Sequence, residues 1–135
     1  MRATTRDPGR AVELAEAGVE GIVADPDRIA TLIPALEHVG AACILLGSAT
    51  GGREALEALH GRRLEMLLLR MLDTTVRGIV YEAVGTVDPA ILAAGGERVR
   101  EFCEDSRIPY ELLDDDRGPW PGAAADAVDR VLAPR

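Results

Sequence analysis

The sequence predicts an α/β fold of three layers, in which a parallel sheet of about five strands lies between helices. Three observations lead to this prediction. Short apolar runs of strand length alternate with helix-like segments along the chain, and the connections between them are short. The run at 41–46 is apolar at every position, which is typical of a strand with both faces covered. No internal repeat or linker interrupts the pattern, so residues 1–135 are expected to form one domain.

The first half of the chain is expected to alternate twice between a strand and a helix. The expected elements are a strand at 1–6, a helix at 9–17, a strand at 21–24 and a helix at 28–36. Gly18 is placed to end the first helix, and Asp27 is placed to cap the second. Pro34 lies within the second helix and is expected to shorten it, because proline has no N–H to donate.

The second half continues the alternation with longer helices. The expected elements are a strand at 41–46, helices at 53–60 and 64–72, a strand at 77–82, a helix at 89–106, a strand at 109–113 and a helix at 123–132. Pro89 suits the first turn of its helix, where no N–H is needed. The helix at 64–72 carries leucine and methionine nearly all round, so it is expected to be deeply buried.

Charge and composition exclude several classes of partner. The net charge is −8, whereas phosphate backbones are bound by clustered cations, so no nucleic-acid partner is expected. No apolar run approaches the roughly 20 residues of a membrane span, and the amino terminus lacks the apolar region of a signal peptide. Cys43 and Cys103 lie in apolar settings and are expected to be buried free thiols. These features favour a cytoplasmic protein without a membrane partner.

The chain contains no lysine, since all 15 basic residues are arginine. This excludes a Schiff-base lysine, the lysine of a Walker A phosphate loop and the Tyr-x-x-x-Lys pair of ordinary short-chain reductases. Tyr81 and Tyr110 have no cation four residues on, because Gly85 and Asp114 occupy those positions. Tyr81 is therefore expected to pack at a strand end, and no catalytic residue is predicted.

Metal ligands are not predicted either. His38 and His60 lie on separate expected helices, with no partner at metal-ligand spacing. The run Asp114-Asp115-Asp116 is expected to be a solvated turn rather than a cation site.

Four segments at the expected strand ends carry a resemblance to a known family. They are Thr4-Thr5-Arg6-Asp7, Val23-Ala24-Asp25-Pro26-Asp27, Leu45-Leu46-Gly47-Ser48-Ala49 and Val80-Tyr81-Glu82. In this order and spacing the chain resembles the nucleoside-diphosphate-sugar epimerase-like proteins, which are atypical or extended short-chain dehydrogenase/reductase relatives with an NAD(P)-binding Rossmann domain. The resemblance runs from that family's second strand to about its sixth. It implies a single Rossmann-like domain, truncated at its N-terminus, that lacks the usual first strand and glycine-rich loop.

The resemblance implies a cofactor site at five residues, with NADP as the cofactor. Arg6 matches an arginine that suits the 2′-phosphate of NADP, and Asp25 matches an aspartate that contacts the adenine amino group. Thr5 lines the same site, and Gly47 and Ser48 match a loop that passes the ribose and phosphate. The residues also have structural interpretations: Arg6 as a solvated side chain, Asp25 as a helix cap, and Gly47 with Ser48 as a small-residue turn.

This cofactor site is expected to be incomplete. No G-x-x-G-x-x-G follows a first strand, and the glycines at 47–52 come too late in the order. Without that loop, no helix amino terminus with its N–H groups is available to hold a pyrophosphate. We therefore expect an NAD(P)-binding protein, related to sugar-nucleotide epimerases and reductases, that is not catalytic on its own. The alternative is a non-catalytic regulatory or interaction module that has lost nucleotide binding.

A missing first strand also changes the expected sheet. In the strand order 3-2-1-4-5-6 that strand lies between the second and the fourth, so its loss leaves two edges with unpaired N–H and C=O groups. Three arrangements are open: the half-sheets close on each other, a second chain supplies the pairing, or the protein extends upstream. We expect closure, or a homo-oligomer formed through the exposed sheet edges.

Overall fold

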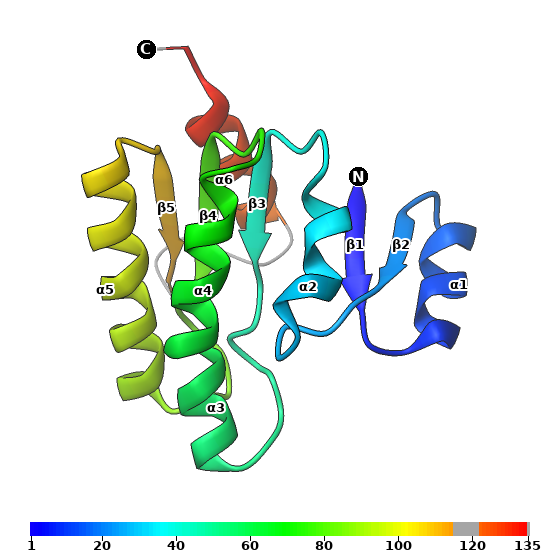
Figure 1. Cartoon of the computed structure of the whole chain (residues 1–135), viewed down its shortest axis with the longest axis horizontal. Helices are drawn as coiled ribbons and strands as arrows, with labels where there is room; N and C mark the ends of the chain where they lie inside the picture. The colour runs from blue at the N-terminus through cyan, green and yellow to red at the C-terminus, as the bar shows by residue number, and fades with distance from the viewer. Residues whose placement is uncertain (115–121, 135) are drawn as a thin grey trace.

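The computed structural model describes residues 1–114 and 122–134, in which strands and helices alternate (Figure 1). The strands are β1 (Arg2–Thr5), β2 (Glu20–Val23), β3 (Ala41–Ile44), β4 (Gly78–Glu82) and β5 (Tyr110–Leu113). The helices are α1 (Pro8–Glu16), α2 (Ile29–Leu32), the 3-10 helix η1 (Ile33–Leu36), α3 (Arg53–Leu59), α4 (Arg62–Met71), α5 (Pro89–Ser106) and α6 (Gly122–Leu132). The predicted alternation of strands and helices is therefore confirmed.

The strands form two parallel sheets rather than one. β1 pairs with β2, with Arg2 opposite Glu20, and β4 pairs with both β3 and β5, with Ile79 opposite Ala42 and Tyr110. Within the described residues β1 forms no ladder with β3, so the expected direct closure of the half-sheets is wrong. The arrangement β2-β1 beside β3-β4-β5 matches the order 3-2-1-4-5-6, with the place of the first strand between the two sheets (Figure 1).

Helices cover both faces of the larger sheet. On one face, residues of α4 and α5, among them Leu68 and Val99, pack against Tyr81 of β4. On the other face, alanines of α6 pack against Val80. Figure 1 shows α4 in front of the strands and α6 behind them. β4 therefore lies at the centre of the core, and residues 79–81 are 0% exposed.

The smaller sheet is covered less completely. α1 packs on β1 and β2, but none of its residues is buried. The Arg2 guanidinium reaches from β1 to the end of η1, where Nη1 donates to the carbonyls of Ala35 and Glu37 at 3.0 and 2.7 Å. The buried residues next to this sheet are Ala24, Ile29 and Leu32. This half of the molecule thus has the smaller core.

The helix expected at 28–36 consists of two elements. α2 ends at Leu32, and η1 continues with Pro34 in its first turn, so the expected shortening is confirmed. The cap expected at Asp27 is wrong, because α2 begins two residues later and Arg28 precedes it without a capping side-chain hydrogen bond. The intervening residues form a turn in which the Arg28 N–H donates to the Asp25 carbonyl at 2.8 Å.

α4 is less buried than its sequence predicts. Leu64, Leu68 and Met71 are buried, whereas Met66, Leu69 and Leu72 just after it are 40%, 59% and 51% exposed. The helix therefore buries one face and leaves apolar side chains on the other. Even so, no helix in the described part of the chain is both long enough and apolar enough to cross a membrane.

Candidate functional site

The five predicted cofactor residues lie at the carboxyl ends of three strands. Thr5 ends β1 and Arg6 follows it, Asp25 lies just after β2, and Gly47 and Ser48 lie in the loop after β3. All strands in Figure 1 point the same way, so these residues share one edge of the fold. They divide between the two sheets, with Thr5, Arg6 and Asp25 on the smaller sheet.

The structure brings Arg6 and Asp25 into direct contact. The Arg6 Nε lies 3.2 Å from Asp25 Oδ1, and Nη2 lies 3.3 Å from Asp27 Oδ2. The Arg63 Nε of α4 lies 3.6 Å from the other oxygen of Asp27, beyond hydrogen-bond length. The Arg6 side chain is 58% exposed. Exposed ion pairs of this kind contribute about 0–1 kcal/mol, so a ligand can displace them at small cost.

Thr5 and Asp25 also shape their own turns. The Thr5 hydroxyl accepts a hydrogen bond from the Asp7 N–H at 3.2 Å. Asp25 Oδ1 accepts from the Asp27 N–H at 2.9 Å, and the Asp25 N–H donates to the Thr31 hydroxyl at 2.8 Å. The structural interpretation of Asp25 as a helix cap is wrong in detail, because its carboxylate closes the turn before α2 instead.

Gly47 and Ser48 bind the loop after β3 to the loop after β4. The Gly47 N–H donates to the Glu82 carboxylate at 2.7 Å, and its carbonyl accepts from the Val87 N–H at 3.0 Å. The Ser48 hydroxyl accepts from the Thr86 N–H at 3.2 Å. A Cβ at Gly47 would lie 1.9 Å from the Val84 carbonyl oxygen, so only glycine fits there.

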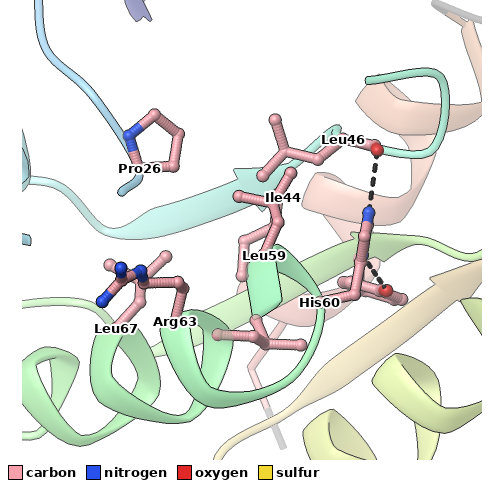
Figure 2. Close-up of a pocket in the computed structure, with 9 residues that line it drawn as sticks. Pro26, Ile44, Leu46, Leu59, His60, Arg63 and Leu67 are labelled. Atoms are coloured by element: carbon pink, nitrogen blue, oxygen red, sulfur yellow. Dashed lines mark hydrogen bonds between the residues drawn. The ribbon is translucent and has the colours of Figure 1, made fainter. Parts of the chain in front are cut away.

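A buried polar pair lies beneath this loop. His60 and Tyr81 are 1% and 0% exposed, and their Nδ1 and hydroxyl oxygen are 2.6 Å apart. His60 Nε2 lies 3.0 Å from the Leu46 carbonyl oxygen. Figure 2 shows His60 below the Leu46 carbonyl, with a dashed line between them. Burial lowers the pKa of His60 and raises the pKa of Tyr81, so both groups are neutral near pH 7.

This pair was not predicted from the sequence. The contact joins residues 21 positions apart, on the turn after α3 and on β4, and no local pattern connects them. The one available signal is that His60 directly follows Leu59 at the end of the apolar face of α3. The expected packing of Tyr81 at a strand end is confirmed by its complete burial.

The cavity nearest the predicted site is small. Pro26 borders it on the side of the smaller sheet, Ile44 and Leu46 on the side of the larger sheet, and Leu59 and Leu67 along the helices (Figure 2). Its volume is about 10 Å³, enough for about one water molecule. A base or ribose would need the two strand-end loops to separate.

A larger depression of about 290 Å³ lies between α3 and α5. Its lining residues are Arg53, Glu57, His60, Ala90, Ile91, Ala94 and Arg98. Arg53 is paired with Asp88 at 2.6 Å and with Glu57 at 2.9 Å, and Arg98 with Glu65 at 2.8 Å. Its cationic groups are therefore already neutralised by carboxylates.

Groups for metal or redox chemistry are sparse. Among the residues that the structure describes, no three His, Cys, Asp or Glu side chains gather as a metal site would require. The acidic turn predicted at 114–116 lies mostly outside the described residues. Cys103 is a buried free thiol whose pKa burial raises to about 12. The expected burial of Cys43 is wrong, because this residue of β3 is exposed, although partial burial of its thiol raises the pKa.

No family model matches this sequence, and no curated protein matches it. Its fold is similar to two solved structures of the triphenylmethane reductase of Citrobacter sp., one of which is complexed with NADP(H). The TM-score is 0.62 and the identity 21% in both comparisons. The likeness covers 82% and 85% of this chain but only 38% and 40% of the reductase chains. It shows the fold, a Rossmann-like α/β arrangement, and the chain spans less than half of those reductases.

Proposed function

We propose that this chain binds the adenosine 2′-phosphate end of NADP at the strand-end edge formed by β1, β2 and β3. In this proposal it is related to the sugar-nucleotide epimerases and reductases, and it does not catalyse a reaction on its own. The contact between Arg6 and Asp25, at the carboxyl ends of neighbouring parallel strands, carries the proposal. That edge is where open α/β sheets bind their ligands.

The residues present suit the adenosine end of the cofactor. The Arg6 guanidinium provides a fork of N–H donors for a phosphate, and its exposed pairs with Asp25 and Asp27 are weak enough to be exchanged. Asp25 stands beside it to accept from the adenine amino group. Gly47 and Ser48 would approach the ligand from the larger sheet.

The residues present suit the pyrophosphate poorly. The helix that follows β1 already has its amino terminus capped by the Asp7 carboxylate, which accepts from the Gly9 N–H at 2.9 Å and would repel a phosphate. When bound, NADP(H) supplies hydride transfer. Tyr81, a candidate acid by residue type, is fully buried, and this supports binding without turnover.

A second candidate is the regulatory or interaction module without a nucleotide. All five predicted site residues already have partners within the chain. The need for glycine at position 47 is explained by the Val84 carbonyl alone. These observations favour a fold whose former ligand contacts now hold its own loops together.

Calorimetric titration of the chain with NADPH, NADH and AMP separates the two candidates. Binding at Arg6 predicts that NADPH binds more tightly than NADH. Loss of a charge-assisted hydrogen bond costs about 1.5–3 kcal/mol, so Arg6→Glu should weaken NADPH binding about 10- to 100-fold and abolish the preference. Arg10→Glu, an exposed arginine on α1 paired with Glu13 at 4.0 Å, is the matched control and should leave the preference intact.

Two outcomes contradict the proposal. No heat of binding with any of the three ligands favours the module without a nucleotide. An NADPH preference that survives Arg6→Glu removes Arg6 from the site. Thermal unfolding of each variant shows whether a lost signal reflects a lost fold.

A further inference from the structure

The hydrogen bonds of His60 allow one assignment of its protons. The Leu46 carbonyl can only accept, so His60 Nε2 must carry the proton that it donates over 3.0 Å. Because His60 is neutral, Nδ1 has a free lone pair and accepts from the Tyr81 hydroxyl over 2.6 Å. With the imidazole ring in this orientation, both ring nitrogens of His60 and the Tyr81 hydroxyl each have a hydrogen-bond partner.

This chain of bonds ends on a single peptide group. The Leu46 carbonyl and the Gly47 N–H belong to the same peptide plane. Its oxygen accepts from His60 Nε2 at 3.0 Å and from the Ala49 N–H at 3.2 Å, and its N–H donates to the Glu82 carboxylate at 2.7 Å. Tyr81 and Glu82 are consecutive residues of β4, so one strand fixes both ends of this peptide, directly through Glu82 and indirectly through His60.

We propose that His60 and Tyr81 are positioning residues, which set the orientation of the Leu46–Gly47 peptide and so the direction in which Gly47 and Ser48 face the nucleotide edge. The effect on how Gly47 and Ser48 face a nucleotide rests on the function proposed above. The effect on the orientation of the Leu46–Gly47 peptide does not depend on that function.

The packing around the pair supports a positioning role. Gly95 of α5 lies directly over the Tyr81 hydroxyl, and a Cβ there would lie 2.1 Å from the oxygen. On the other side of the loop, the Val84 carbonyl fills the space beside Gly47. The hydroxyl and the loop are therefore both held by close backbone contacts, and the histidine ring spans the distance between them.

Two substitutions at one position test this role. In His60→Gln the amide nitrogen takes the place of Nε2 and keeps the donor to the Leu46 carbonyl. In His60→Asn the shorter side chain reaches only as far as Nδ1, so it keeps a partner for Tyr81 and loses Leu46. Both variants lose the imidazole ring, so loss of the ring alone does not separate them. His38→Asn is the control, because His38 is exposed and asparagine tolerates its φ of 61°.

The first readout is hydrogen exchange of the Gly47 amide, which needs no ligand. The lost hydrogen bond is expected to change the opening equilibrium of this loop about tenfold. The Gly47 amide should therefore exchange about tenfold faster in His60→Asn than in His60→Gln, after correction for global stability from urea unfolding. His38→Asn should exchange like the unmodified chain. Equal Gly47 exchange in the two His60 variants would overturn the proposal.

The second readout is the tautomer of His60, followed by 15N NMR of the unmodified chain. The proposal requires a single neutral form with the proton on Nε2. Tyr81→Phe, which removes only the hydroxyl oxygen, should shift the Nδ1 resonance and leave the Nε2 proton in place. A proton on Nδ1, or an average of the two forms, would contradict the assignment.

NADPH titration of the same variants connects the pair to the nucleotide. His60→Asn should bind about tenfold more weakly than His60→Gln. If the unmodified chain binds no nucleotide while Gly47 exchange still separates the two variants, the proposed function fails and the positioning role stands. If exchange is equal, the positioning role fails whatever the titration shows.

Discussion

At the scale of single residues, His60 makes stability depend on pH. Burial lowers its pKa in the folded state, against the Leu46 carbonyl and the Glu82 charge, which favour the protonated ring. In the unfolded chain the pKa is about 6.5. Between these two pKa values the unfolded chain binds more protons, so the free energy of unfolding falls as the pH drops below about 6.5, by at most about 1.4 kcal/mol per pH unit.

Urea unfolding between pH 5 and 7.5 measures this dependence. His60→Gln does not titrate, so its slope should be smaller than that of the unmodified chain, and other groups cancel in the difference. Equal slopes would mean that His60 is protonated alike in both states.

The sequence predicted which residues share an edge of the fold, but not which side chains touch. Arg6 and Asp25 follow neighbouring parallel strands, so their shared edge needed only the strand order, whereas their ion pair was not predicted. The pairing of His60 with Tyr81 depends on how the turn after α3 packs on β4, which is set by the whole core. Asp27 was assigned to the wrong role because an aspartate just before a helix looks the same in the sequence whether it caps that helix or, as here, contacts the Arg6 guanidinium.

At the scale of elements, two adjacent glycines of α5 have different roles. A Cβ at Gly95 would lie 2.1 Å from the Tyr81 hydroxyl oxygen, whereas one at Gly96 would lie 3.5 Å from Leu112 Cδ1, an ordinary contact. Overpacking typically costs about 1–3 kcal/mol, so Gly95→Ala should destabilise the protein by that amount. Gly96→Ala should be neutral or stabilising by about 0.5–1 kcal/mol, as for other helical glycines.

Chemical denaturation followed by circular dichroism compares the two variants. Both gain the same helical preference of alanine, so the difference between them isolates the contact with Tyr81. Similar stabilities would show that α5 can shift away from β4 without cost.

The bounds of helices were predictable where a capping residue or a proline marks the helix end. α5 runs from Pro89 to Ser106 as predicted, and Asp88 caps it by accepting from the Ala90 N–H at 2.9 Å. Burial of whole faces was less predictable. The exposed Leu69 of α4 shows that an apolar helix surface does not reveal which of its sides meets the sheet.

At the scale of the whole molecule, the two sheets should differ in local stability. Two-stranded sheets are marginal without further packing, and α1 adds no buried residue to the smaller one. The amides of Ala24 and Ile79 have comparable hydrogen bonds, to the Thr5 and Pro109 carbonyls at 2.8 and 3.0 Å. We expect the Ala24 amide to exchange about 100-fold faster, which corresponds to about 2.7 kcal/mol.

Native-state hydrogen exchange monitored by NMR tests this expectation. If Ala24 and Ile79 exchange at the same rate, the two sheets open as a single unit. A homo-oligomer formed through the exposed sheet edges stays a prediction, for which sedimentation velocity is the direct measurement.

The global order of the strands was predictable from the four strand-end segments, but the split into two sheets was not, because one sheet of about five strands was expected. The expected closure of the two halves was wrong. In the structure the Arg2 side chain of β1 donates to two carbonyls at the end of η1, and within the described residues β1 forms no ladder with β3.

The consecutive placement of Tyr81 and Glu82 on β4 has a consequence for how the chain finds its native pairing. Side chains alternate along a strand, so a slip of β4 by one residue would turn Val80 and Glu82 toward α5 and bury a carboxylate where a hydroxyl now meets an imidazole. A shifted alignment of β4 would therefore place an unpaired charge in the interior. An alignment of β4 shifted by one residue is therefore disfavoured relative to the native register.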